Sequence, residues 1–333
     1  MKSLYWKTIN IRKEIISVYN LLFYNYIEDD GNNFRLNYSK DFLMWALTPP
    51  NYYKEWHLGL EVIINNNKQL IGFISGIPVT TSIEGKKEII CEINFLCVDK
   101  KFRNIGITKL LIEELTKRIK FKNIQQGIYT SGDLFLKPFS SSKSYQKLLN
   151  VKKLIEVKFC ERHTDEDSLY NKVYLKGLRL MEDDDVLIVN KLLNKFLKKF
   201  KIHPEYNKRE FLHWFLKKDI VKTYVVENNN KITDFCSFYI LYYSIIDNNK
   251  YKNIKVAYLY YYFNFETPLK ILIDNIVIIA KILKVDVFTF VDIMDNKKII
   301  TSLQFKPCDN FLHYYLYGNN NSIPSKDIGF TMI

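Results

Sequence analysis

Long apolar runs are missing from this sequence. No stretch approaches the ~20 apolar residues that a helix needs to cross a bilayer. Met1 is followed at once by Lys2, and Lys7 comes soon after, so the first residues contain no apolar block of the kind found in secretory signal peptides. We therefore expect neither a transmembrane segment nor a secreted protein.

Paired cysteines and metal-ligand spacings are also missing. The chain has five cysteines, an odd number, and none forms a C-x-x-C pair with another. The five histidines show no metal-binding spacing. We expect free, mostly buried thiols in a reducing cytoplasm, with no bound metal and no disulfide. The cysteines concerned are Cys91, Cys97, Cys160, Cys236 and Cys308.

Nucleic-acid-binding signatures are absent although the formal net charge is +13. A basic surface gives non-specific affinity for phosphates, so nucleic-acid binding is one interpretation of this charge. The lysines, however, are scattered along amphipathic segments such as 198–201, and no zinc-finger or RNA-binding motif accompanies them. We expect no nucleic-acid partner, and a solvated surface that attracts a polyanionic cofactor or an anionic membrane.

The sequence does contain an internal repeat. Its 333 residues, 47% of them hydrophobic, suffice for one large unit or for two ordinary domains. Residues 41–47 (DFLMWAL) resemble 210–216 (EFLHWFL), and residues 63–75 resemble 225–237. Both members of the second pair have β-branched runs around an Asn-rich turn, which predicts a hairpin. A repeat of this length indicates gene duplication rather than a solenoid.

The predicted elements repeat in the same order. Each half reads as helix, hairpin, strand, helix, strand, helix, strand. The expected helices are 11–26, 107–121, 184–200 and 269–283, and the expected strands outside the hairpins include 93–98, 126–130, 256–263 and 285–290. We predict an α/β (α+β) fold whose two pseudo-symmetric halves, 1–165 and 166–333, share a continuous mixed sheet and meet near 164–177.

A strand, a turn and a helix form the most informative local motif. Residues 92–98 read as a buried strand, and the turn that follows has the form Arg103-x-x-Gly106-x-Thr108. A helix that begins after such a turn offers free N–H groups and a positive dipole end to a pyrophosphate. The equivalent turn of the second half, 265–268, is acidic and would repel one. We expect the first half to bind the cofactor and the second to shape the acceptor site.

The heptapeptide Glu92-Ile93-Asn94-Phe95-Leu96-Cys97-Val98 resembles the signature of the glycylpeptide N-myristoyltransferases, which have a duplicated acyl-CoA N-acyltransferase (GNAT-like) fold. Similarity to this family extends over almost the whole chain. Further family-like stretches are 26–30, 42–50, 70–78, 153–159, 233–239 and 314–317, together with the apolar end, 328–333.

The resemblance implies an enzyme that transfers a myristoyl group from myristoyl-CoA to the N-terminal glycine of proteins. Its cofactor-binding half would be 1–165, and 166–333 would shape the peptide site; the enzyme would be a cytoplasmic monomer. The main-chain N–H groups of Phe95 and Leu96 would form the oxyanion hole. The implied cofactor contacts are Phe95, Leu96, Cys97, Val98, Arg103, Asn104, Gly106, Ile107 and Thr108.

The same resemblance implies an unusual base, the main-chain carboxylate of Ile333. A carboxylate is a weak base in water, but burial beside a cationic amine favours proton transfer to it. Asn94 and Thr130 would lie near the acceptor amine, although each could instead cap a strand or turn. Substrate contacts would come from Tyr26, Glu28, Asp29, Asp30, Phe34, Tyr38, Tyr145 and Asp309. The acidic run at 28–30 would attract a substrate lysine, or would simply form a solvated turn.

Departures from the family pattern leave two other functions open. Gly106 stands in a turn that is cationic in the family, and the family's N-terminal arm is not found, which favours a short-chain N-acyltransferase. The family's glycine-rich loop is eroded at 306–310, which favours a non-catalytic acyl-CoA or lipopeptide binder. Gln146 replaces a histidine, and 241–243 replaces a Leu-Pro-Ser element. Cys97 suggests a covalent acyl-enzyme, but no histidine lies near it in the sequence, so a buried structural thiol is the better interpretation.

Overall fold

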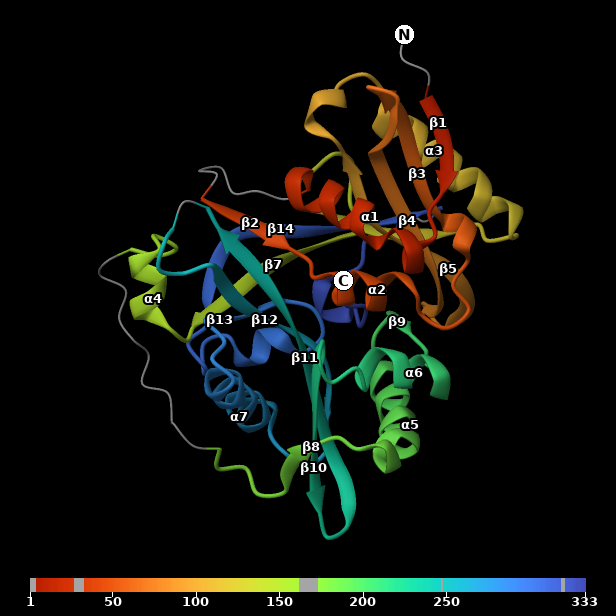
Figure 1. Cartoon of the computed structure of the whole chain (residues 1–333). Helices are drawn as coiled ribbons and strands as arrows, with labels where there is room; N and C mark the ends of the chain where they lie inside the picture. Colours follow the sequence, from red (N-terminus) through yellow and green to blue (C-terminus); the bar gives the residue numbers. More distant parts are fainter. Residues whose placement is uncertain (1–3, 27–32, 162–172, 247, 319–320) are drawn as a thin grey trace.

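The computed structural model of the chain describes residues 4–26, 33–161, 173–246, 248–318 and 321–333. The first half is built from β-strands and helices in alternating groups (Figure 1). In chain order they are β1 (Leu4–Thr8), α1 (Ile11–Asn25), β2 (Phe34–Asn37), α2 (Lys40–Leu47), β3 (His57–Ile64), β4 (Asn67–Ile83), β5 (Lys86–Val98), α3 (Ile107–Phe121), β6 (Gly127–Ser131), β7 (Ser140–Leu148) and α4 (Val151–Glu156).

The second half repeats this order. Its elements are β8 (Leu178–Leu180), α5 (Val186–Leu197), β9 (Ile202–Pro204), α6 (Lys208–Phe215), β10 (Val221–Asn228), β11 (Lys231–Ile245), β12 (Asn253–Asn264), α7 (Leu269–Ile282), β13 (Val287–Val291) and β14 (Lys306–Tyr317). Each element from β1 to β7 therefore has a counterpart from β8 to β14, and α4 is an addition after β7. The predicted duplication is confirmed.

Among the described residues, all fourteen strands belong to one sheet. Its path runs β1-β3-β4-β5-β6-β14-β7-β13-β12-β11-β10-β8, while β2 pairs with β11 and β9 pairs with β4. Most neighbours are antiparallel, but β5–β6 and β12–β13 are parallel. The predicted continuous mixed sheet is thus confirmed.

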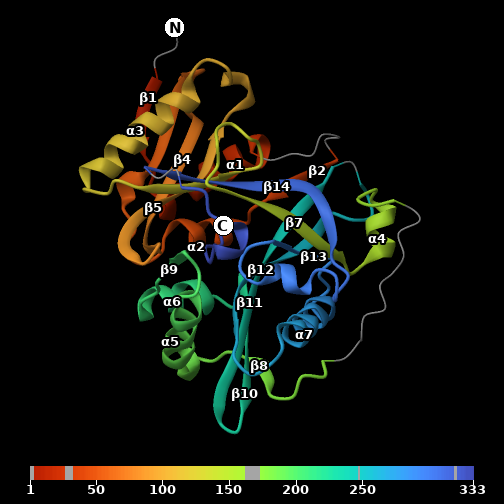
Figure 2. The ribbon, with the colours of Figure 1, turned by 180° about the vertical axis from the view of Figure 1, so that it is seen from behind.

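The two halves exchange strands reciprocally. Strand β7 of the first half lies between β14 and β13, and β14 of the second half lies between β6 and β7. Likewise β2 crosses to β11, and β9 crosses to β4. Figures 1 and 2 show the resulting arrangement, with the C-terminus near the middle of the molecule and β1 at its outer edge. The exchange makes the central region a product of both halves.

Helix α3 shows how the sequence sets local structure. Its buried residues are Ile107, Leu111, Leu115 and Ile119, one every four positions, so they form one stripe along the helix. This stripe packs against apolar residues of β3, β4 and β5. The helix spans the predicted residues, because its apolar period and its glycine-containing start leave little choice of boundary.

One predicted element is wrong. The sequence suggested a helix between the last two strands of each half, but residues 132–139 connect β6 to β7 without a helix. The side chain of Tyr315 holds this connection, because its Oη accepts a hydrogen bond of 3.3 Å from the main-chain N–H of Phe135. In the second half the corresponding connection contains only the short 3-10 helix Asn296–Ile299. Tertiary contacts, rather than helix propensity, decide the course of these connections.

Candidate active site

Strand β5 is interrupted where the sequence predicted the thioester site. Phe73 pairs with Cys97 and Ser75 pairs with Asn94, so two residues of β5, Phe95 and Leu96, face a single residue of β4. This is a β-bulge. Phe95 is buried and has a φ of 57°, a left-handed conformation that is uncommon for a bulky residue. The bulge turns main-chain groups of β5 out of the regular ladder.

The neighbouring strand diverges at the same place. Parallel pairing between β5 and β6 is limited to Cys91 with Gly127 and Glu92 with Ile128. Beyond Glu92, both strands continue without pairing to each other: β5 ends at Val98 and β6 at Ser131. Main-chain groups that face each other beyond this point are therefore not used in pairing between these two strands.

Two tyrosines cover the bulge. The rings of Tyr26 and Tyr38 lie 6.2 Å and 5.2 Å from the ring of Phe95, measured between centroids. Burial raises the pKa of the Tyr26 phenol to about 12, and a hydrogen bond with the main chain of Phe95 opposes this rise. A hydrogen bond lowers the pKa of a phenol when the phenol oxygen accepts it, because the bond then stabilises the phenolate. The donor is therefore the main-chain N–H of Phe95. One of the two expected oxyanion donors thus contacts Tyr26.

The turn after β5 leads into an uncapped helix N-terminus. Asn104 and Gly106 have φ values of 63° and 86°, and Gly106 is the N-cap of α3 without a side-chain hydrogen bond to the first turn. The first N–H groups of a helix have no partners within the helix, so this end suits an anion. Ile107 is buried and anchors the helix, while Thr108 is exposed.

Arg103 joins the end of β5 to the end of α1. Its Nε donates a hydrogen bond of 3.2 Å to the Val98 carbonyl, and its Nη2 donates to the Asn25 carbonyl. Asn25 in turn accepts, through its side-chain oxygen, a 3.0 Å hydrogen bond from the main-chain N–H of Lys100. Arg103 is nevertheless exposed, so its charge faces solvent beside the helix N-terminus. The side chain therefore has a structural role, because it joins the end of β5 to the end of α1.

The C-terminal segment lies in the middle of the molecule and is well anchored. Ile328 pairs with Ile202, and the Gly329 N–H donates a 2.7 Å hydrogen bond to the Ile202 carbonyl. The Thr331 N–H donates to Tyr261 Oη at 2.9 Å, and Thr331 Oγ1 donates to the Tyr260 carbonyl at 3.1 Å. Ile328, Phe330 and Met332 are buried. The segment is therefore part of the core rather than a frayed end.

Glu92 brings this segment next to the bulge. Its carboxylate accepts a hydrogen bond from the main-chain N–H of Ile333, and its Oε1 accepts a 2.8 Å hydrogen bond from Asn94 Nδ2. Burial raises the pKa of Glu92 to about 7, while these two hydrogen bonds lower it. Asn94 is fixed by its carbonyl, which accepts a 2.8 Å hydrogen bond from Ser75 Oγ. Three of the predicted site elements, the bulge, Asn94 and Ile333, thus lie together.

The second half has an equivalent bulge that is closed. Cys236 pairs with Tyr262 and Phe238 with Leu259, so Tyr260 and Tyr261 of β12 face the single residue Ser237. Ser237 Oγ accepts a 3.1 Å hydrogen bond from the Tyr261 N–H and donates a 2.9 Å bond to the Tyr261 carbonyl. Thr331 contacts the Tyr260 carbonyl and the Tyr261 hydroxyl of the same bulge, as described above. The second-half bulge is therefore bridged by Ser237 and Thr331, whereas the contact described at the first-half bulge comes from Tyr26.

Comparison with protein families identifies the chain. The model of the N-terminal domain of Myristoyl-CoA:protein N-myristoyltransferase matches residues 1–142, and that of the C-terminal domain matches residues 152–327. The chain belongs to the N-myristoyltransferase family. The predicted family membership is therefore confirmed.

Individual N-myristoyltransferases are similar over most of the chain. Glycylpeptide N-tetradecanoyltransferase 2 of Bos taurus is 40% identical over 324 residues, which are 94% of this chain and 65% of the bovine protein. Glycylpeptide N-tetradecanoyltransferase of Plasmodium falciparum is 40% identical over 323 residues, 94% of this chain and 78% of that protein. The chain thus spans about two thirds to four fifths of the length of these relatives.

Solved structures agree on the fold. Saccharomyces cerevisiae N-myristoyltransferase with bound myristoyl-CoA superposes with a TM-score of 0.93 at 35% identity, covering 99% of this chain and 86% of the yeast chain. A GCN5-related N-acetyltransferase from Anabaena variabilis has a TM-score of 0.55 at 10% identity, covering 94% of this chain and 72% of that one. The second likeness concerns the fold alone, and it agrees with the predicted GNAT-like architecture.

Three other predicted site residues lie on the neighbouring central strands β6, β7 and β14 of the sheet. Thr130 lies on β6, half-buried, and pairs with Tyr314 of β14. Tyr145 lies on β7 and stacks on Phe290, with 6.2 Å between ring centroids. Asp309 is exposed at an irregular part of β14.

One part of the predicted peptide site is not brought to the bulge, and another lies outside the described residues. Phe34 packs instead against Phe159, with 5.5 Å between ring centroids, in a separate apolar cluster. The acidic residues Glu28, Asp29 and Asp30 lie outside the described residues.

Cys97 has the environment of a structural thiol. It is buried, its Sγ lies 3.8 Å from the Leu21 carbonyl, and burial raises its pKa to about 12. Such a thiol is a poor nucleophile, because the thiolate is the reactive form. Within the described ranges, no three His, Cys, Asp or Glu side chains group as metal ligands, and no helix is long and apolar enough to span a membrane.

Sequence reasoning missed several residues of this centre. Glu92 is the first residue of the heptapeptide 92–98, but it was assigned no role from the sequence. A carboxylate within an otherwise apolar strand could have indicated a functional residue. Tyr261 and Tyr314 belong to tyrosine-rich strands, and nothing in their spacing distinguished them from core residues. Tyr314 Oη is buried and, in the described part of the chain, has no hydrogen-bond partner. Burial raises its pKa, and Glu92 is among the charges that contribute.

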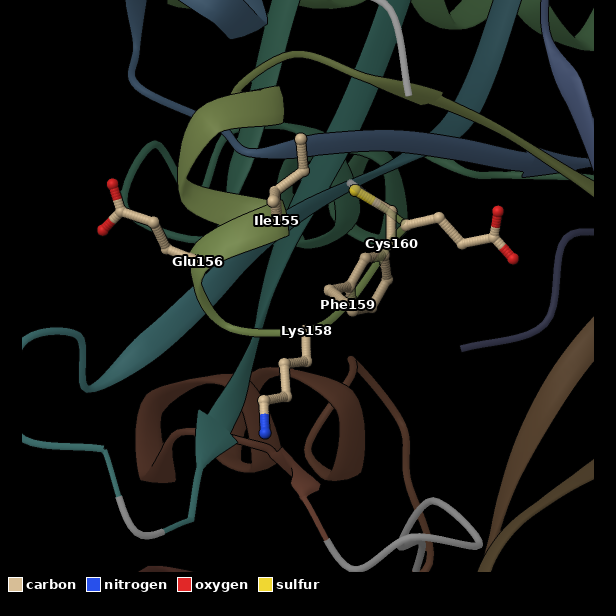
Figure 3. Close-up of a pocket in the computed structure, with 6 residues that line it drawn as sticks. Ile155, Glu156, Lys158, Phe159 and Cys160 are labelled. Atoms are coloured by element: carbon tan, nitrogen blue, oxygen red, sulfur yellow. The ribbon is translucent and has the colours of Figure 1, made fainter. Parts of the chain in front are cut away.

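A separate hollow lies at the end of α4 (Figure 3). Its volume is about 670 Å³. Figure 3 shows the side chains of Glu156 and Lys158 pointing away from each other at its edge. None of its six lining residues is a predicted site residue. The lining residues are Ile155, Glu156, Lys158, Phe159, Cys160 and Glu161.

Proposed function

We propose that this chain transfers a myristoyl group from myristoyl-CoA to the α-amine of an N-terminal glycine. The observation that carries the proposal is the meeting of the β5 bulge with the anchored C-terminal segment through Glu92. Family membership supports the acyl donor and the acceptor, because relatives are named for tetradecanoyl transfer to glycylpeptides.

The first half supplies the donor site in this proposal. The uncapped N-terminus of α3, with Gly106 in its turn and Arg103 beside it, suits the phosphates of CoA. The gap between β5 and β6 suits the pantetheine arm and its thioester. The N–H groups of Phe95 and Leu96 would stabilise the oxyanion, which requires the thioester oxygen to share or displace the Tyr26 contact at Phe95.

The acceptor amine would be activated by the carboxylate of Ile333. The amine nitrogen attacks the thioester carbon, the carbon–sulfur bond breaks, and the thiolate of CoA leaves. The carboxylate takes a proton from the ammonium form of the acceptor, whose pKa in water is ~8, so that the neutral amine can attack. The second proton that the nitrogen loses as the amide forms goes to the leaving thiolate, which departs as the CoA thiol. Asn94 and Thr130, on strands β5 and β6, would orient the amine. Tyr26, Tyr38, Tyr145 and Asp309 would contact the following residues of the peptide.

A direct assay tests this proposal. The purified chain is incubated with myristoyl-CoA and a peptide that begins with glycine, and the products are weighed by mass spectrometry. We expect one added myristoyl group on the glycine amine. A matched peptide with an acetylated N-terminus should remain unmodified, since it has no free amine. Myristoyl-CoA binding in the same sample without any product would contradict the proposed activity and would support a non-catalytic binder.

The choice of acyl group separates long-chain from short-chain transfer. We expect myristoyl-CoA to be used in preference to acetyl-CoA when the two compete for the same peptide. Equal use of both would contradict a long-chain pocket and would identify a short-chain N-acyltransferase.

The proposal includes a monomeric enzyme in a reducing cytoplasm. Free thiols at Cys91, Cys97 and Cys236, all buried, support a reducing compartment. Sedimentation equilibrium should give the mass of a single chain, 39.8 kDa. A concentration-independent mass of twice this value would contradict the monomer.

A further inference from the structure

Glu92 contacts two groups that the proposed reaction uses. Its carboxylate accepts hydrogen bonds from the Ile333 N–H and from Asn94 Nδ2, the latter at 2.8 Å. Glu92 pairs with Ile128 at the last parallel contact between β5 and β6, where the strands begin to diverge. Only 5% of the residue is exposed, so a single buried carboxylate links the strand edge to the end of the chain.

The other contacts of the C-terminal segment hold the residues before Ile333, so the hydrogen bond from the Ile333 N–H to Glu92 acts on the last residue. Hydrogen bonds from Gly329 and Thr331 hold the segment up to residue 331. Met332 is buried by apolar packing. The Ile333 side chain packs against the core, and the polar contact given for its main chain is the hydrogen bond to Glu92. This bond therefore restrains the orientation of the last peptide unit, which carries the terminal carboxylate.

We propose that Glu92 is a positioning residue for acyl transfer: it holds the main chain of Ile333 and the amide of Asn94 so that both face the acceptor amine. This inference rests on the proposed function above. A carboxylate beside the Ile333 carboxylate also adds negative charge around the amine, which favours binding of an ammonium group and raises the proton affinity of its neighbour. Glu92 thus acts through Ile333, and forms no bond with the acyl group.

The surroundings of Glu92 fit this role. Burial raises its pKa to about 7, so its charge changes in the range in which the enzyme would work. No cation is among the groups that shift this pKa, so an incoming ammonium would be the first positive charge beside it. Tyr314 Oη has no hydrogen-bond partner in the described part of the chain, and the charge of Glu92 contributes to the raised pKa of this phenol. The titratable groups that interact with Glu92 are Cys91, Tyr206, Tyr239, Tyr260, Tyr261 and Tyr314.

The first test measures the position of Ile333 without any acyl transfer. The Glu92→Gln variant and the unchanged protein are treated with a carboxypeptidase under native conditions, and loss of Ile333 is followed by mass spectrometry. We expect release about tenfold faster from Glu92→Gln, because a charged acceptor is lost. Glu88→Gln is the matched control, since Glu88 lies on the same strand and should leave the release unchanged. Equal release from Glu92→Gln and the unchanged protein would overturn the proposal.

The second test measures the reaction. Single-turnover rates are recorded against pH with myristoyl-CoA already bound. We expect the single-turnover rate of Glu92→Gln, at its optimum pH, to be at least ~10-fold lower than that of the unchanged protein. Its pH–rate profile should also lack the step that arises from titration of Glu92. Its affinity for myristoyl-CoA should be unchanged. A purely structural residue would lower the fraction of active enzyme without changing the shape of the profile, and that result would contradict the role given to Glu92.

The two tests separate this inference from the proposed function. If the unchanged protein transfers no acyl group but Glu92→Gln exposes Ile333, the proposed function fails and the positioning contact stands. If Glu92→Gln does not fold, Glu92→Asp replaces it, since it keeps the charge but shortens the side chain. We expect Glu92→Asp to release Ile333 faster than the unchanged protein, and unchanged release from that variant would overturn the proposal.

Discussion

Gly329 lies against the ring of Phe200 so closely that a Cβ added at Gly329 would sit 2.6 Å from Phe200 Cδ2. Phe200 is buried and cannot move aside freely. This contact lets the C-terminal segment pass between the two halves of the molecule, and it places residues 330–333 beside β5 and β12.

Gly329→Ala should displace this segment. We expect a loss of ~1–3 kcal/mol in the free energy of unfolding, because overpacking in a dense core is relieved only by backbone shifts. Acyl transfer should fall by at least ~10-fold with little change in myristoyl-CoA affinity, since the donor site lies elsewhere. Chemical denaturation and single-turnover assays measure the two effects. Gly132→Ala is the control, because a Cβ there meets no atom within 4 Å; equal behaviour of the two variants would contradict the prediction.

Stability should depend on pH through Glu92. Its pKa in the folded protein, about 7, is above the ordinary value of 4.5. The folded state therefore holds a proton that the unfolded state releases between these values, and stability falls as pH rises through this window. The full effect is about 3 kcal/mol. The thermal midpoint of Glu92→Gln, relative to that of the unchanged protein, should be higher at pH ~8 than at pH ~5. Glu88→Gln should show no such trend, and a flat difference for Glu92→Gln would disprove the assignment.

Arg103→Ala should weaken the donor site. The side chain donates to the carbonyls of Val98 and Asn25 and places its charge beside the α3 N-terminus. We expect about tenfold weaker binding of myristoyl-CoA, with a smaller dependence of the affinity on salt and a nearly unchanged rate at saturation. Titration calorimetry at two ionic strengths measures this. Arg12→Ala, an exposed arginine on α1, is the control. Unchanged affinity in Arg103→Ala would place the phosphates elsewhere.

Adding residues after Ile333 should slow the reaction. An extension removes the free carboxylate from its place beside Glu92 but leaves the donor site intact. We expect turnover to fall by at least ~10² while myristoyl-CoA binding stays nearly unchanged. The same residues added before Met1 serve as the control for the presence of a tag. An extended protein with an unchanged turnover number would refute the assignment of the Ile333 carboxylate as the base.

Much of this protein could be predicted from its sequence because the signals are local. The stripe from Ile107 to Ile119 specified α3, and the β-branched runs around Asn-rich turns specified the hairpins. The repeat itself was visible because matched residues recur in the same order. The motif from Glu92 to Thr108 predicted a buried strand, a turn and a helix, and the structure has β5 and α3 at these positions. The donor site itself was predicted from the family resemblance of this motif.

The sequence by itself determined the elements, their duplication and the family resemblance, since each depends on residues that are neighbours along the chain. Only the tertiary structure decided that β7 and β14 exchange places, that Thr331 closes the second bulge, and that Glu92 meets Ile333. Those contacts join residues far apart in sequence, and they depend on the packing of whole strands against one another. No local pattern of side chains encodes such packing, which is why the strand, turn and helix from Glu92 onward were predictable and their meeting with the C-terminal segment was not.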